Sequence, residues 1–147
     1  MTAGKLDIAN YVGELTAAAR RAARRMLSST AAEKNAALEA IALALETSSD
    51  GLKRENATDL DAARAAGLAA PLVERLKLSD PVIASMVRGV RGVAKLDDPV
   101  GRVDRDWTTD AGLRIEKVRQ PIGVIVVIYE SRPNVTVDSA ALCLKSG

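Results

Sequence analysis

The sequence predicts an α/β fold in which a helical part precedes the start of a parallel sheet. Apolar residues recur at helical spacing through most of residues 1–98. Near Pro99 the pattern changes to the alternation expected of a β-hairpin over 100–118. An apolar run at 123–129 then leads through a polar loop into a helix, and this order is the first half of a βαβ unit.

The composition is that of a globular chain and excludes several kinds of chemistry. The net charge of +2 gives no overall field that would attract nucleic acid or a membrane. No apolar run approaches the length of a membrane-spanning helix, the N-terminus does not resemble a signal peptide, and the one cysteine cannot form an internal disulfide. We therefore expect a cytoplasmic protein. The absence of histidine excludes Ser-His and Cys-His nucleophiles within the chain, and together with the one cysteine it argues against a zinc site.

The first predicted helix covers residues 6–27 and carries a cluster of arginines in its last two turns, at Arg20, Arg21, Arg24 and Arg25. Such a cluster could bind nucleic acid, or it could complement the helix dipole on a solvated face. No aromatic residues lie between the arginines to stack on bases, so the sequence favours the second interpretation.

Three further helices are predicted from their end signals. Thr30 and Glu33 form the pattern of a capping box, followed by a predicted buried stripe of Ala37, Leu38, Ile41 and Leu45. A helix over 58–66 is expected to end at Gly67. The next begins at Ser79-Asp80-Pro81 and ends at Asp97-Asp98-Pro99. Its predicted buried face consists of Val82, Ile83, Met86, Val87, Val90 and Val93.

The last part of the sequence predicts a buried strand followed by a ligand-binding loop. Residues 124–129 are apolar on both faces, as a central parallel strand requires. Ligands of open α/β sheets bind at the carboxyl ends of strands, which here is the loop at 130–134. The sequence ends after the next predicted helix, at 135–145, with no further strand to pair with this one, so we expect the chain to be incomplete.

The stretch 118–136 resembles the glutamate-5-semialdehyde dehydrogenase (gamma-glutamyl phosphate reductase) family of the aldehyde dehydrogenase superfamily. The string Tyr-Glu-Ser-Arg-Pro-Asn at 129–134 is specific to the family, whereas Pro-Ile-Gly-Val at 121–124 is shared across the superfamily. Similar segments lie at 34–38, 56–64 and 138–147.

The resemblance implies an aldehyde-dehydrogenase-like fold with three parts. Residues 1–99 would be the helical part of the cofactor-binding domain, and 100–120 a hairpin used in oligomerisation. Residues 121–147 would begin a Rossmann-like NADP-binding core. The sequence contains no Gly-rich dinucleotide fingerprint, but the superfamily binds its cofactor without one.

The activity implied by the resemblance is the NADPH-dependent reduction of L-glutamyl 5-phosphate to L-glutamate 5-semialdehyde, with release of phosphate, in proline biosynthesis. In this family a cysteine thiolate takes the acyl group, and that cysteine lies beyond the position of Gly147. We therefore expect the 147-residue chain to be inactive by itself. The implied partners are further copies of the full-length chain and glutamate 5-kinase, with no nucleic acid, membrane or metal.

The residues implied to bind ligands lie in and just before the loop. Arg132 could hold the phosphate or carboxylate of the substrate with a two-pronged hydrogen bond. Asn134 could equally bind substrate or cap the following helix. Glu130 stands where the wider superfamily has an oxyanion-hole asparagine, so the oxyanion donor is unassigned. The substrate-binding set is Glu130, Ser131, Arg132 and Asn134, and the cofactor-binding set is Ile128 and Tyr129.

The only cysteine is not expected to be the nucleophile. Cys143 lies between Leu142 and Leu144 on a predicted helix, where a free cysteine usually acts as a small buried hydrophobe. Two other functions remain open at this stage. One is a non-catalytic helical binding or assembly module that uses the arginine cluster and the hairpin, and the other is a related acyl-phosphate reductase with a different substrate.

Overall fold

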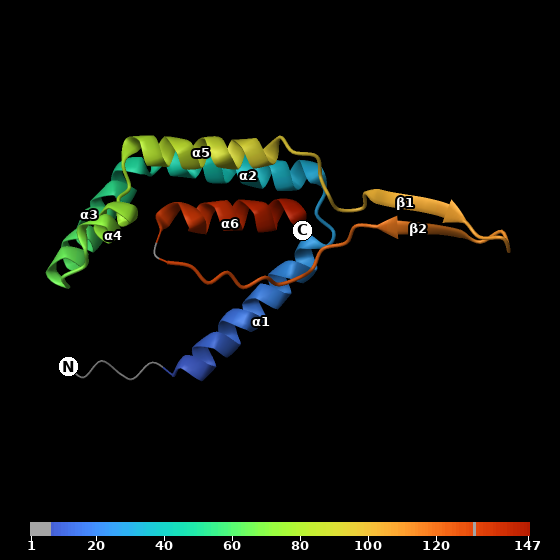
Figure 1. Cartoon of the computed structure of the whole chain (residues 1–147), viewed down its shortest axis with the longest axis horizontal. Helices are drawn as coiled ribbons and strands as arrows, with labels where there is room; N and C mark the ends of the chain where they lie inside the picture. Colours follow the sequence, from blue (N-terminus) through green and yellow to red (C-terminus); the bar gives the residue numbers. More distant parts are fainter. Residues whose placement is uncertain (1–6, 131) are drawn as a thin grey trace. The chain divides into compact units, whose positions relative to one another are not determined.

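A computed structural model describes residues 7–130 and 132–147 and shows a mainly helical chain with one β-hairpin (Figure 1). The predicted helical character up to residue 98 and the hairpin at 100–118 are both confirmed over the described residues. The helices are α1 (Ile8–Met26), α2 (Ala31–Thr47), α3 (Ser49–Ala65), α4 (Ala70–Leu76), α5 (Asp80–Ala94) and α6 (Pro133–Ser146), and the strands are β1 (Val103–Thr108) and β2 (Arg114–Val118).

The chain divides into two compact units. One contains the residues up to Ser29 together with Val100–Val126 and Gly147, and the other contains Thr30–Pro99 and Val127–Ser146. The division suggested by the sequence, at residues 99 and 120, remains a prediction.

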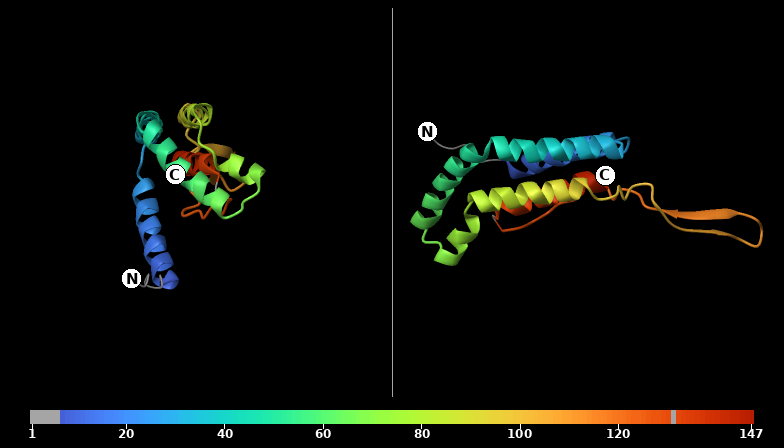
Figure 2. Two further views of the ribbon diagram at one scale, coloured as in Figure 1. Left: turned by 90° about the vertical axis from the view of Figure 1, so that its left-hand side faces the viewer. Right: turned by 90° about the horizontal axis from the view of Figure 1, so that it is seen from above.

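The core of the second unit lies where α2, α5 and α6 pack against one another. Figures 1 and 2 show α2 and α5 side by side, with α6 packed against both. Small and branched side chains fill the contact: Leu38 and Ala42 of α2, Val87 and Val90 of α5, and Ala141 of α6. Leu38 and Ala42 have no exposed surface. Burying a leucine or valine side chain contributes roughly 1.5–3 kcal/mol.

The predicted capping box at the start of α2 is confirmed. The Thr30 backbone N–H donates to Glu33 Oε2 at 2.7 Å, and the Glu33 N–H donates to Thr30 Oγ1 at 3.2 Å. The hydrogen bonds from the Thr30 backbone and hydroxyl lower the pKa of the Glu33 carboxyl. The predicted buried stripe of α2 is wrong at Ala37, which is exposed, and the buried position one turn before Leu38 is taken by Lys34.

The segment from α3 to α4 differs from the predicted one. Helix α3 begins at Ser49 rather than at residue 58, because Asp50 favours the positive end of a new helix directly after α2. Its predicted end at Gly67 is confirmed. Gly67 has φ +74°, its N–H donates to the Arg64 carbonyl, and the Leu68 N–H donates to the Ala63 carbonyl, which together form a Schellman motif.

Helix α4 was not predicted from the sequence. It contains Pro71 in its first turn, where a missing N–H costs no intrahelical bond. The side chain of Asn56, buried on α3, fixes the end of α4 in two places. Its Nδ2 donates to the Leu76 carbonyl at 2.8 Å, and its Oδ1 accepts from the Leu78 N–H at 2.7 Å.

Helix α5 begins at Asp80, as predicted, with Pro81 in its first turn. Ile83, Met86, Val87 and Val90 are buried, while Val82 and Val93 at the ends of the predicted face are only half-buried.

Two buried lysines join α6 to α2 and α5. Lys145 Nζ donates to Asn35 Oδ1 at 2.6 Å and to the Ala94 carbonyl at 3.1 Å. Lys34 Nζ lies 2.7 Å from Asp98 Oδ2 and 3.4 Å from the Lys145 carbonyl. Because a buried ammonium group requires all of these partners, only one alignment of the three helices satisfies both lysines.

The predicted buried strand at 123–129 is wrong for this chain. Residues 121–130 are in no strand, and the only sheet among the described residues is the pair β1 and β2. The exposed fractions of Ile122, Val126 and Ile128 are 89%, 79% and 94%. A strand is stabilised by hydrogen bonds to a neighbouring strand, and no described segment supplies one, so no Rossmann-like sheet forms here.

The first unit contains α1 and the hairpin. The side chain of Asp7 caps α1 by accepting from the Asn10 N–H at 3.2 Å, and no residue of α1 is buried. In the antiparallel hairpin Trp107 lies opposite Ile115, with an irregularity between Val103 and Arg105. The Arg105 guanidinium lies 5.1 Å from the centre of the Trp107 ring. All of β1 is exposed. No helix in the described part of the chain has the length and hydropathy that a membrane span requires.

Replacement of Asn56 by alanine is expected to destabilise the second unit. Asn56→Ala removes both hydrogen bonds that hold the end of α4, and it leaves the Leu76 carbonyl and the Leu78 N–H without their partner. The expected loss is about 1–3 kcal/mol of unfolding free energy, measured by urea denaturation at low protein concentration. The exposed neighbour Glu55→Ala serves as control, and equal midpoints for the two variants would contradict the structural role of Asn56.

Candidate functional site

The loop predicted to bind substrate is held by the first turn of α6. The Val135 N–H donates to the Arg132 carbonyl at 3.2 Å, and the Arg132 N–H donates to the Glu130 carbonyl at 2.6 Å. Pro133 begins α6 directly after Arg132, where its fixed φ suits a first helical turn. Glu130 and Arg132 are therefore positioned by the helix, while Ser131 lies outside the described residues.

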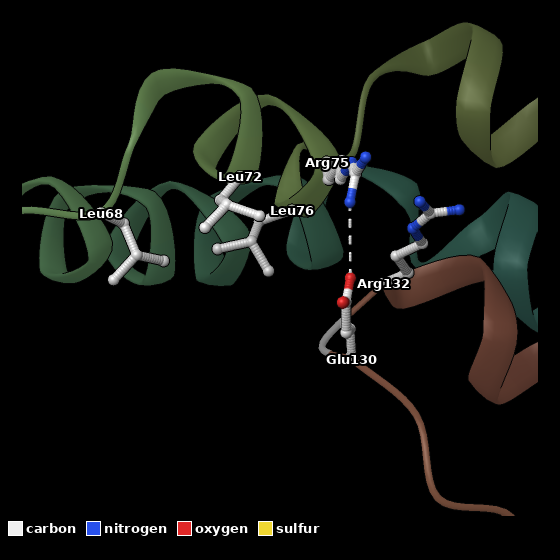
Figure 3. Close-up of a pocket in the computed structure, with 6 residues that line it drawn as sticks. All are labelled: Leu68, Leu72, Arg75, Leu76, Glu130 and Arg132. Carbon is white, nitrogen blue, oxygen red and sulfur yellow. Dashed lines mark ion pairs between the residues drawn. The ribbon is translucent and has the colours of Figure 1, made fainter.

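Glu130 and Arg132 line a hollow beside α4, which we name the α4 hollow (Figure 3). Its volume is about 330 Å³, and it is lined by Leu68, Leu72, Arg75, Leu76, Glu130 and Arg132. Leucines form one end and charged groups the other, as Figure 3 shows. The charged end has two guanidinium groups and one carboxylate, so it carries one net positive charge and favours a ligand with more negative than positive groups.

An ion pair crosses the charged end of the α4 hollow. Arg75 Nη1 lies 3.5 Å from Glu130 Oε2, and the two side chains are 50% and 73% exposed. An ion pair this exposed contributes between nothing and about 1 kcal/mol, because water screens it. A ligand can therefore replace either half of this pair at little cost.

Helix α4 positions Arg75 through contacts made by its neighbours. Val73 and Leu76 pack against Leu60 and Ala63 of α3, and Asn56 holds the Leu76 carbonyl. These contacts fix the rotation of a helix that has only seven residues. Arg75 was not found from the sequence, because no helix was predicted over the residues that follow Pro71. The signal was present in the helical spacing of Leu72, Val73 and Leu76 after that proline.

Asn134, the third predicted ligand that the structure describes, lies in a different hollow. This hollow of about 350 Å³ is lined by Pro81, Val82, Ser85, Met86, Asn134 and Asp138. Asn134 is inside α6, where its Nδ2 donates to Asp138 Oδ2 at 3.2 Å. The N-cap interpretation of Asn134 is therefore wrong, since the helix begins before it, and its role as a ligand remains a prediction.

The two residues predicted to line the cofactor cleft line neither of the hollows described above. Ile128 is 94% exposed, and neither Ile128 nor Tyr129 lines the α4 hollow. The Tyr129 hydroxyl is hydrogen bonded to Thr136 Oγ1 in the first turn of α6. The cofactor role of this pair remains a prediction.

Cys143 is half-buried rather than buried as predicted. It lies on α6 next to the exposed Leu142. No described basic side chain is bonded to its sulphur. Among the described residues, no group of histidine, cysteine, aspartate or glutamate side chains is arranged to hold a metal ion.

Two solved structures resemble this chain closely, while no family model matches it. A gamma-glutamyl phosphate reductase from Thermotoga maritima is 43% identical over 87% of this chain, with a TM-score of 0.83. A gamma-glutamyl phosphate reductase from Saccharomyces cerevisiae is 36% identical over 87% of the chain, also with a TM-score of 0.83. The matches cover 31% and 33% of those proteins, so this chain spans about a third of their length.

The thiol of Cys143 is expected to react slowly in the folded chain. Its half-buried position limits the access of a reagent to the sulphur. Labelling with a chromogenic disulfide reagent should be about tenfold slower in buffer than in urea. Labelling in buffer that is faster than in urea would show an activated thiol and would contradict this description.

Proposed function

The chain belongs to the gamma-glutamyl phosphate reductase family, and on this basis we propose that it is part of an enzyme that reduces L-glutamyl 5-phosphate to L-glutamate 5-semialdehyde with release of phosphate. The observation that carries the proposal is the 43% identity with a TM-score of 0.83 over 87% of the chain. The charge of the α4 hollow supports it, because the substrate is a small anion. The enzyme would act in proline biosynthesis in the cytoplasm.

We assign the loop before α6 to the substrate. Arg132 would hold the phosphate or the carboxylate, because a guanidinium can donate two parallel hydrogen bonds to either group. Ser131 and Asn134 would add neutral donors, and Glu130 would also contact the substrate. The hydride donor that we propose is NADPH, and Ile128 and Tyr129 would line its cleft in the complete enzyme.

The covalent step needs a cysteine thiolate that takes the acyl group as a thioester before it is reduced. Cys143, the only thiol in this chain, has no activating neighbour among the described residues. We therefore place the nucleophile outside these 147 residues. The exposed hairpin of β1 and β2 would join copies of the complete enzyme, and glutamate 5-kinase would be a functional partner.

A reductase of a different acyl phosphate is the closest alternative, because the family match identifies the type of reaction more strongly than the substrate. Comparing the rate of phosphate-dependent oxidation of glutamate 5-semialdehyde with the rates for other aldehydes distinguishes the two functions. A purely structural module is disfavoured, since it gives no reason for the string at 129–134 that is specific to the reductase family.

Replacement of Arg132 is expected to impair use of the substrate in the complete enzyme that contains this chain. For Arg132→Ala, kcat/KM for phosphate-dependent oxidation of glutamate 5-semialdehyde should fall about 30-fold, equivalent to about 2 kcal/mol. The KM for NADP should change little. Arg88→Ala, an exposed arginine on α5 that does not line the α4 hollow, is the matched control. An unchanged kcat/KM for Arg132→Ala would remove this residue from the site.

The 147-residue chain by itself is expected to be inactive and poorly soluble. Its exposed apolar segment at 121–130 can pair with the same segment of another chain. Gel filtration should show large aggregates, and the double change Val126→Lys and Ile128→Lys should increase the soluble fraction. A soluble monomer that oxidises glutamate 5-semialdehyde would contradict both expectations.

A further inference from the structure

We propose that Arg75 and Glu130 together recognise the α-amino acid head group of the substrate, leaving Arg132 for the phosphate at its other end. This inference rests on the proposed function and deepens it. It adds Arg75, which comes from α4, to a site that had been assigned only to the loop before α6.

The charges of the α4 hollow are complementary to those of a γ-glutamyl phosphate. Such a substrate carries one ammonium group beside one carboxylate at its α-carbon, and a phosphate at the far end. The hollow presents one carboxylate, Glu130, beside one guanidinium, Arg75, with a second guanidinium, Arg132, on the same rim (Figure 3). Each substrate charge can therefore meet a group of opposite sign.

The pairing of Arg75 with Glu130 indicates which two groups take the head. Their charged atoms lie 3.5 Å apart, so they form an adjacent positive and negative pair. An ammonium and a carboxylate on one carbon are also adjacent, and they can replace this ion pair with two ion pairs of the same kind. The exchange costs little, because the pair is half exposed and weak in the empty protein.

The surroundings of the Arg75–Glu130 pair favour ligand binding here rather than at another ion pair of the chain. Leu68, Leu72 and Leu76 line the apolar end of the hollow and would exclude water from one side of the ligand. Charge-assisted hydrogen bonds strengthen when water is excluded. By contrast, the pair of Arg64 and Asp61 on α3 has a shorter distance of 2.8 Å but does not line the hollow.

Two aldehyde substrates distinguish the role of Glu130 from that of Arg75. Glutamate 5-semialdehyde has both the amino group and the α-carboxylate, whereas 5-oxopentanoate has the carboxylate but lacks the amino group. Glu130→Gln should lower kcat/KM about tenfold for glutamate 5-semialdehyde and much less for 5-oxopentanoate, so that the ratio between the two falls. Arg75→Gln should raise KM about tenfold for both aldehydes and leave the ratio unchanged.

The measurement uses the complete enzyme that contains this chain, with phosphate and NADP in the oxidation direction. Arg75→Lys should restore part of the loss, Arg64→Gln should behave as the parent, and thermal unfolding confirms that each variant folds. An unchanged ratio in Glu130→Gln, or an unchanged KM in Arg75→Gln, overturns the inference.

Failure of the proposed function gives a different result. An enzyme that oxidises neither aldehyde contradicts the proposed reaction. The head-group inference is then tested by calorimetric titration of the same protein with L-glutamate and with glutarate. A preference for L-glutamate over glutarate that disappears in Glu130→Gln supports the inference, and equal binding of the two, or no binding of either, overturns it.

Discussion

The position of the candidate site depends on the buried ammonium group of Lys145. Its Nζ atom is held by Asn35 of α2 and by the carbonyl of Ala94 at the end of α5. A charge that is only 4% exposed is costly unless it is fully hydrogen bonded, so the last turn of α6 has one acceptable place. Helix α6 has 14 residues and is about 21 Å long. Because a helix is stiff, fixing its last turn also fixes its first turn, which begins at Pro133 directly after Arg132.

The opposite wall of the α4 hollow is fixed by a neutral group instead. Asn56 satisfies one carbonyl and one N–H at the end of α4 and so holds Arg75 next to its partner Glu130. The contrast between the two anchors follows from their surroundings. A neutral amide is enough between the two helices α3 and α4, whereas a charged amine reaches across the junction of three helices and aligns them by its need for several acceptors. The ligand-facing groups themselves remain exposed and weakly paired, as a binding site that must exchange partners requires.

Features set by neighbouring residues could be predicted from the sequence, and features set by distant ones could not. The capping box at Thr30, the Schellman end at Gly67 and the start of α5 at Asp80 depend on side chains within a few positions. The burial of Lys34 and Lys145 could not be predicted in this way, since a lysine is expected at the surface. Their partners lie 64 and 110 positions away, and no local pattern indicates them. Arg75 combines both cases. The spacing of Leu72, Val73 and Leu76 is a local signal for its helix, whereas its pairing with Glu130, from a distant part of the chain, has no local signal.

The segment at 121–130 shows why helices and strands differ in how far the sequence of one chain predicts them. Each helix here forms its backbone hydrogen bonds within itself, so α1 is helical even though none of its residues is buried. A strand has no such bonds of its own. The residues of this segment are apolar on both faces, like those of a central strand, yet among the described residues the segment has no partner and its side chains are left exposed. The same sequence pattern that identifies the family thus requires a sheet, and the surface that it exposes is the one that such a sheet would cover.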